Sequence, residues 1–162
     1  MILRKLRDET DLYFLYETMK LRDYSFFSNA IYRGNFGYFC SGFDRLLSDY
    51  FHDFYLIADG EKRFGYVATH DFKSMDSHCF VELNANVNEN DYKTILTIFL
   101  KKLIKEYDLN KVFTLIIDES KLAVCSSLGF TEEACLKNYI YEGGKLNDLR
   151  IYSYKFEEVK FR

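Results

Sequence analysis

The chain has 162 residues, of which 48% are hydrophobic and 29% charged, and its formal net charge is -3. These proportions are typical of a folded protein and exclude a largely disordered chain, so we expect a single domain over residues 1–162. Acids and bases are mixed along the sequence without a basic stripe, which argues against nucleic-acid binding.

Targeting and metal signals are also missing from the sequence. There is no apolar run of about 18 residues, so we expect no transmembrane helix and no membrane partner. The opening "MILRKLRDETD" is not typical of a signal peptide. Four cysteines without CxxC spacing predict reduced thiols in a cytoplasmic protein. His70, His78 and Cys79 do not have the spacing of a zinc motif and would meet only by chance in the fold, so no zinc is expected. The cysteines are Cys40, Cys79, Cys125 and Cys135.

The first third of the chain predicts one strand and two helices. Residues 2–6, "ILRKL", alternate apolar and basic side chains, as a half-buried strand does. Apolar side chains at helical spacing predict helices at 10–22 and 43–51. Residues 24–42 contain three glycines and no clean period, so we predict a loop with a short helix. Twelve of the 30 Phe and Tyr residues lie between Tyr24 and Tyr55, and core packing explains most of them.

The rest of the chain alternates strands and helices. "FYLIADGEKRFGYVATHDF" (54–72) reads as a hairpin with an Asp-Gly turn, followed by a strand at 78–87. An amphipathic helix at 91–107 is expected to bury Ile95 to Ile104 on one face. The apolar run at 110–118 predicts a central strand. A short helix at 119–128 and strands at 131–141 and 148–157, joined by "EGGKLN", complete the pattern. This order predicts a mixed α/β (α+β) fold with helices on both faces of the sheet.

The same order resembles the GNAT superfamily of acetyl-CoA-dependent N-acyltransferases, over nearly the whole chain. It looks most similar to the branch of the ribosomal-protein N-terminal acetyltransferases and their relatives that act on polyamines and amino sugars. The motifs that carry the resemblance are Leu128-Gly129-Phe130, Glu132-Glu133, Gly144 and Asp148, in that order. The resemblance implies a mostly antiparallel seven-stranded sheet that splays between strands 4 and 5, here 78–87 and 110–118. Asp148 we interpret as structural, bonded to backbone in the last turn.

In this family the pantetheine arm of acetyl-CoA lies between the splayed strands and the pyrophosphate sits at the start of the following helix. That helix start is "NENDYKT", residues 88–94. The family's loop there is rich in glycine, but no glycine lies between Gly65 and Gly129. Glu89 and Asp91 would oppose an anion. The resemblance assigns the donor site to Ala85, Asn86, Val87, Asn88, Tyr92, Lys93, Thr94 and Asp118.

Catalysis in the family needs a base for the acceptor ammonium and often an acid for the departing thiolate. The resemblance places the base at Glu82, which could equally be a solvent-facing strand residue. It places the acid at Cys125, where relatives often carry tyrosine. A thiol has an ordinary pKa of about 8.5 and donates a proton poorly. A buried structural cysteine is the alternative for this position.

Two functions follow from this reading. The first is transfer of an acetyl group from acetyl-CoA to a primary amine of a protein N-terminus, polyamine, amino sugar or other small molecule. Segments 24–55 and 142–147 would select the acceptor, and we expect a monomer or homodimer. The second is a catalytically inactive protein of the same fold that binds a ligand or another protein. The missing glycines, Asp118 and Cys125 favour this alternative.

Overall fold

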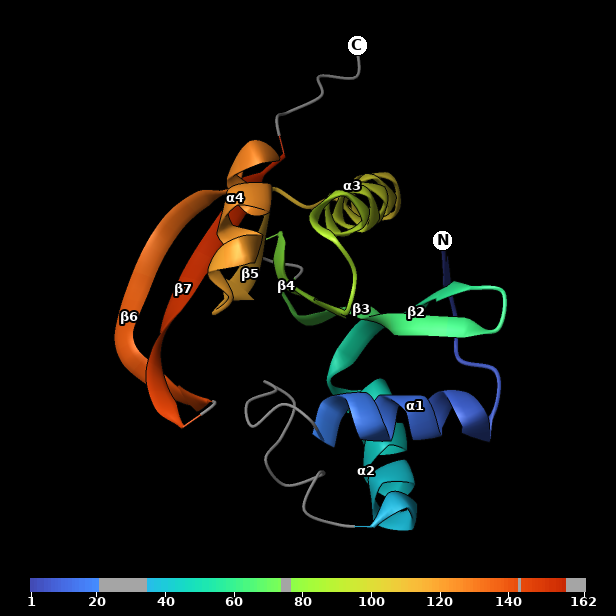
Figure 1. Cartoon of the computed structure of the whole chain (residues 1–162). Coiled ribbons are helices and arrows are strands. Elements are labelled where there is room, and N and C mark those ends of the chain that lie inside the picture. Colours follow the sequence, from blue (N-terminus) through green and yellow to red (C-terminus); the bar gives the residue numbers. More distant parts are fainter. Residues whose placement is uncertain (21–34, 74–76, 143, 157–162) are drawn as a thin grey trace.

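The computed structural model describes residues 1–20, 35–73, 77–142 and 144–156. Seven strands form one sheet in the order β1-β2-β3-β4-β5-β7-β6 (Figure 1). The β4–β5 pair is parallel and every other neighbouring pair is antiparallel. The predicted sheet is therefore confirmed. The elements are β1 (Ile2–Arg4), α1 (Glu9–Lys20), α2 (Phe36–Asp49), β2 (Phe51–Asp59), β3 (Lys62–Lys73), β4 (His78–Ala85), α3 (Glu89–Glu106), β5 (Lys111–Ile116), α4 (Glu119–Ser127), β6 (Thr131–Glu142) and β7 (Lys145–Lys155).

The helices lie on both faces of the sheet, as predicted, with α1 and α2 on one face and α3 and α4 on the other (Figure 1). Each face has its own buried cluster, because side chains alternate between the two faces along a strand. On β3, Val67 packs toward α3 while its neighbours Tyr66 and Ala68 pack toward α1 and α2. None of the helices in the described ranges is long and apolar enough to cross a membrane.

Helix α2 begins at Phe36, seven residues before the predicted start, and this corrects the loop predicted for part of segment 24–42. Phe36, Phe39 and Phe43 lie at helical spacing on the face that packs into the core. Asn35 caps the helix, since its Oδ1 accepts a hydrogen bond from the backbone N–H of Tyr38 at 3.0 Å. Burial of this aromatic face outweighs the cost of two glycines inside the helix. The predicted contributions of residues 24–34 to a binding surface lie outside the described residues.

Three further boundaries and faces differ from the prediction. Strand β2 begins at Phe51, which the sequence pattern predicts as the end of a helix, because its ring is buried beside the other aromatic residues of the sheet. Ile104, predicted to face inward, is 46% exposed, because the buried stripe of α3 ends at Leu103. The loop predicted at 142–147 is shorter, since β6 runs to Glu142 and β7 starts at Lys145.

Gly65 fixes the distance between β3 and β4. Its φ is +154°, and a Cβ added there would lie 2.0 Å from the backbone oxygen of Asn84. No side chain can occupy this position without separating the strands, because real Cβ contacts never approach so closely. Gly65 pairs with Ala85 at the end of β4. The close approach therefore sets where the last residues of β4 lie.

Candidate active site

The central feature of the sheet is the divergence of β4 from β5. The two parallel strands pair only at His78–Lys111, Cys79–Val112 and Phe80–Phe113 within the described residues. Beyond Phe80, β4 continues to Ala85 in contact with β3, while β5 continues to Ile116 in contact with β7. The facing edges of the two strands therefore separate and leave backbone groups available to a ligand. This is the splay expected between strands 4 and 5.

A cavity of about 1120 Å³ opens where these strands end, on the face that carries α1. Helix α1 contributes Phe14 and Thr18, and the start of β3 contributes Arg63. The other walls come from the ends of β4 and β5 and from the start of β7. The remaining lining residues are Lys62, Phe64, Asn84, Asn86, Ile117, Asp118, Glu119, Lys145, Leu146, Asn147, Asp148 and Arg150.

Ion pairs hold several charged residues of the wall in place. Arg63 donates through Nε to Oδ1 of Asp11 at 2.6 Å, and Arg150 donates through Nη1 to Oε2 of Glu132 at 3.0 Å. Asp148 accepts from Nζ of Lys137 at 2.6 Å. These charges are neutralised by partners beside the cavity. The cavity surface therefore carries both signs of charge rather than a single strong field.

Glu82 lies on β4 with its side chain on the α1 and α2 face, two residues before the cavity residue Asn84. Its Oε1 accepts a hydrogen bond from the hydroxyl of Tyr66, which is fully buried. The charge of Glu82 also contributes to raising the pKa of Tyr50 to about 12, after burial and Asp71. Glu82 does not itself line the cavity. A proton moving from the cavity to this carboxylate therefore needs a bridging water.

Asn84 is a site residue that we did not single out from the sequence. Its side chain is 4% exposed and lines the cavity. Its Nδ2 has no hydrogen-bond partner among the described residues. The only sequence signal for Asn84 is that it is a polar residue in the alternating strand "HCFVELNANV". Glu82 is polar as well, so this pattern does not show which of the two residues lines a cavity.

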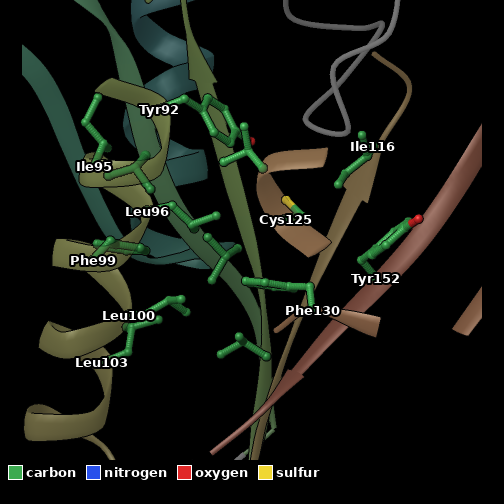
Figure 2. Close-up of a cluster of buried hydrophobic side chains, with 14 of the residues drawn as sticks. Tyr92, Ile95, Leu96, Phe99, Leu100, Leu103, Ile116, Cys125, Phe130 and Tyr152 are labelled. Carbon is green, nitrogen blue, oxygen red and sulfur yellow. The ribbon is translucent and has the colours of Figure 1, made fainter. Parts of the chain in front are cut away.

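Cys125 lies in the core between α4 and the sheet (Figure 2). Its exposed fraction is 0%, and burial raises the pKa of its thiol to about 12. It is not among the residues that line the cavity. This closed position fits the buried structural cysteine given above as the alternative to an acid.

At the start of α3, several polar groups that could bind a phosphate already have partners within the protein. Asn88 caps the helix, since its Oδ1 accepts from the N–H of Asp91 at 2.9 Å. Tyr92 is buried, and its N–H donates to the backbone oxygen of Asn88 at 2.9 Å. The hydroxyl of Thr94 donates to the backbone oxygen of Asn90 at 2.8 Å. Lys93 is exposed and is a cation of this turn that a phosphate can reach.

The structure distributes the remaining predicted donor-site residues over two places. Asn86 and Asp118 both line the cavity, at the ends of β4 and β5. Asp118 also caps α4, accepting from the N–H of Ser120 at 3.0 Å. Ala85 and Val87 belong to the core beneath α3. The predicted donor-site residues in this group thus lie partly on the cavity wall and partly in the core beneath α3.

Asp148 bonds to backbone, although in a bulge and not in the last turn. Its Oδ1 accepts from the N–H of Asn138 at 3.0 Å, where β6 departs from regular pairing with β7. Asn138 has a positive φ of 51°.

In the described part of the chain, no three His, Cys, Asp or Glu side chains gather as metal ligands.

A family model for the acetyltransferase (GNAT) domain matches residues 35–151. No curated protein matches the chain by sequence. Solved structures match its fold over nearly its full length. A mutant spermidine N-acetyltransferase from Vibrio cholerae has a TM-score of 0.78 at 16% identity, covering 96% of this chain and 95% of that one. The dodecameric structure of the enzyme from the same species has a TM-score of 0.79 at 16% identity, covering 95% and 92%. These identities are low, so the likeness shows the fold alone.

Proposed function

The chain belongs to the GNAT family of acetyltransferases, whose domain model covers residues 35–151, and we propose that its acceptor is a primary amine of a linear polyamine. Membership makes the protein an acetyl-CoA-dependent N-acetyltransferase. The observation that carries the assignment to this site is the divergence of β4 from β5 beyond Phe80, beside a cavity of about 1120 Å³. The gap between the strands would admit acetyl-CoA, and the cavity would admit the amine acceptor.

Glu82 is the proposed general base. A primary amine with an ordinary pKa of about 10.4 is protonated at neutral pH and cannot attack a thioester. Glu82 takes that proton through a water molecule in the cavity. The nitrogen lone pair then bonds to the acetyl carbon, and the carbon–sulfur bond breaks with its electron pair on sulfur. A second nitrogen proton passes to solvent, the thiolate takes one proton from solvent, and Glu82 returns its own proton to solvent, so that the amide, the thiol and one released proton result.

A polyamine is favoured as the acceptor for two reasons. The similar solved structures are named as spermidine N-acetyltransferases, which supports a polyamine over the other acceptors considered above. Asp118 and Glu119 lie on the wall of the cavity and can pair with a second ammonium group. Lys62 and Lys145 on the same wall limit how many positive charges the acceptor can carry there.

An amine panel tests the acceptor. Purified protein with acetyl-CoA is offered spermidine, glucosamine and a short peptide with a free N-terminus, and free thiol release is measured. We expect the highest kcat/KM for spermidine. A higher value for the peptide or the sugar contradicts the polyamine proposal while leaving acetyl transfer intact. An intact fold with no thiol release for any amine and no calorimetric heat with acetyl-CoA favours the inactive binding protein instead.

Glu82→Gln tests the base. General base catalysis contributes about 100- to 10,000-fold, so kcat/KM should fall by at least about 100-fold while the Kd for acetyl-CoA is unchanged. The loss should shrink as the pH rises toward the pKa of the free amine, because less acceptor then needs deprotonation. Glu61→Gln, in an exposed turn, is the matched control. A kcat/KM within twofold of the parent protein excludes Glu82 as the base.

The monomer or homodimer expected above stays a prediction for the assembly. A similar solved structure is described as dodecameric. Sedimentation equilibrium of the purified protein distinguishes these states.

A further inference from the structure

The strongest unexplained feature of the cavity is the side-chain amide of Asn84. The residue is 96% buried, since only 4% of its surface is exposed. Its Nδ2 nevertheless has no hydrogen-bond partner among the described residues. A buried donor left without a partner destabilises a fold, so such groups are rare without a reason. Asn84 itself lines the cavity where β4 has separated from β5, and its Nδ2 lies beneath the cavity surface.

The backbone holds Asn84 firmly in this place. Asn84 pairs with Tyr66, and the following residue, Ala85, pairs with Gly65. Because Gly65 has no side chain, β3 approaches the backbone of Asn84 more closely than any other residue would allow. The N–H of Asn86 also donates to the backbone oxygen of Phe64 at 2.8 Å. A donor held by strand pairing directly beneath the wall of a cavity is preorganised for a ligand group that enters that cavity.

The spacing along β4 relates this donor to the proposed base. Glu82 and Asn84 are two residues apart on the same face, which is about 7 Å along a strand. Acyl transfer needs the base on one side of the attacking nitrogen and a hydrogen-bond donor on the carbonyl oxygen beyond it. The order along the strand is therefore base first and oxygen donor second.

We propose that Nδ2 of Asn84 donates a hydrogen bond to the carbonyl oxygen of the acetyl group and stabilises the negative charge that develops there. This inference rests on the proposed function, because it assigns a residue to the acetyl-transfer site. Together with Glu82, Asn84 would then be a second residue of β4 with a specific role in acetyl transfer. The contact is directed at the acetyl group and not at the rest of acetyl-CoA.

Asn84→Leu tests the proposal, because leucine has a similar shape but no donor. Removing one oxyanion donor lowers kcat by about 100- to 1,000-fold. In calorimetry, Asn84→Leu should weaken acetyl-CoA binding about threefold to tenfold and leave the Kd of CoA, which lacks the acetyl oxygen, unchanged. The melting temperature should rise by a few degrees, because the variant no longer buries an unpaired donor. Asn110→Leu, at an exposed position before β5, is the control.

The possible results distinguish the role of Asn84 from the proposed acetyl transfer to an amine. Equal losses of acetyl-CoA and CoA affinity, or a kcat within twofold of the parent protein, overturn the role of Asn84. Inactivity of the parent protein toward every amine refutes the proposed function, and the acetyl-CoA to CoA affinity ratio still tests Asn84. Should Asn84→Leu fail to fold, Asn84→Ala removes the donor with a smaller side chain, and acetyl-CoA should again lose affinity relative to CoA.

Discussion

Replacing Asp11 by asparagine removes a carboxylate that ties α1 to two strands of the sheet. The Asp11 side chain is fully buried. Its two oxygens accept from the guanidinium group of Arg4 at 2.6 and 2.8 Å, and Oδ1 also accepts from Nε of Arg63 at 2.6 Å. Oδ2 accepts from the N–H of Arg7 at 2.9 Å. Through Arg63 the same carboxylate positions one wall of the cavity.

The size of the effect follows from the burial of the partners. Breaking a buried ion pair by removing one member costs about 3–5 kcal/mol. The side chains of Arg4 and Arg63 are only 10% and 16% exposed, so water compensates little for the lost charge. Asparagine can still accept one hydrogen bond, which places the loss near the lower end, at about 3 kcal/mol. For a chain of this length the melting temperature should fall by about 6–12 °C.

Thermal and urea unfolding at pH 7 measure this loss, and the dependence on pH adds a second test. The hydrogen bond from Arg4, followed by those from Arg63 and Arg7, lowers the pKa of the Asp11 carboxyl despite its burial. Its stabilisation is therefore fully present above the unfolded pKa of about 3.9 and is lost as the pH falls toward the lower folded value. The difference between Asp11→Asn and the parent protein should shrink over that acidic window.

Asp59→Asn is the matched control for the charge change. Asp59 is exposed at the end of β2, and such a substitution usually changes stability by less than about 0.5 kcal/mol. A loss below about 1 kcal/mol for Asp11→Asn at pH 7 would refute the reasoning, since desolvation of the three charges would then offset their attraction. An unchanged difference between pH 7 and pH 3 would refute it independently.

Two further substitutions test the packing around the site. Gly65→Ala places a Cβ 2.0 Å from the backbone oxygen of Asn84, so circular dichroism should show little folded protein. Gly60→Ala is the control, because a Cβ there meets nothing within 4 Å. Its left-handed backbone should cost only about 1–2 kcal/mol of stability. Cys125→Ala should lower stability by about 1 kcal/mol and leave kcat within twofold. In the folded parent protein Cys125 should resist iodoacetamide at pH 9, as fragment-ion mass spectrometry of the digested protein can show for that residue, because its pKa is about 12. Alkylation without unfolding, or a large loss of kcat, contradicts its place in the core.

The fold could be predicted from the sequence because local patterns and the order of elements agree. The Asp-Gly turn at Gly60, the buried stripe of α3 and the apolar run of β5 are each local signals that the sequence shows directly. Boundaries were less predictable where tertiary contacts compete with local preferences. The start of α2 illustrates this, because its phenylalanines gain burial only when they meet the sheet.

The site could be predicted only in part, for a physical reason. Glu82 and Asp118 follow from position in a family pattern, but a pattern does not show which face of a strand a cavity occupies. The importance of Asn84 depends on an unpaired buried nitrogen, which only the packing of Tyr66 and Gly65 against β4 can create. Asp11 is likewise paired across 52 residues with Arg63, a contact that no local period indicates.

The burial of Cys125 changes what the site must provide. Without an acid at that position the sulfur leaves as a thiolate, and an ordinary thiol pKa of about 8.5 makes the thiolate a stable leaving group near neutral pH. The charge that most needs stabilisation is then the one that develops on the acetyl oxygen before the carbon–sulfur bond breaks. A donor beside that oxygen contributes more than an acid beside the sulfur. The unpartnered amide of Asn84 and the closed environment of Cys125 are thus consistent with the proposed site, in which Glu82 is the proposed base for the acceptor.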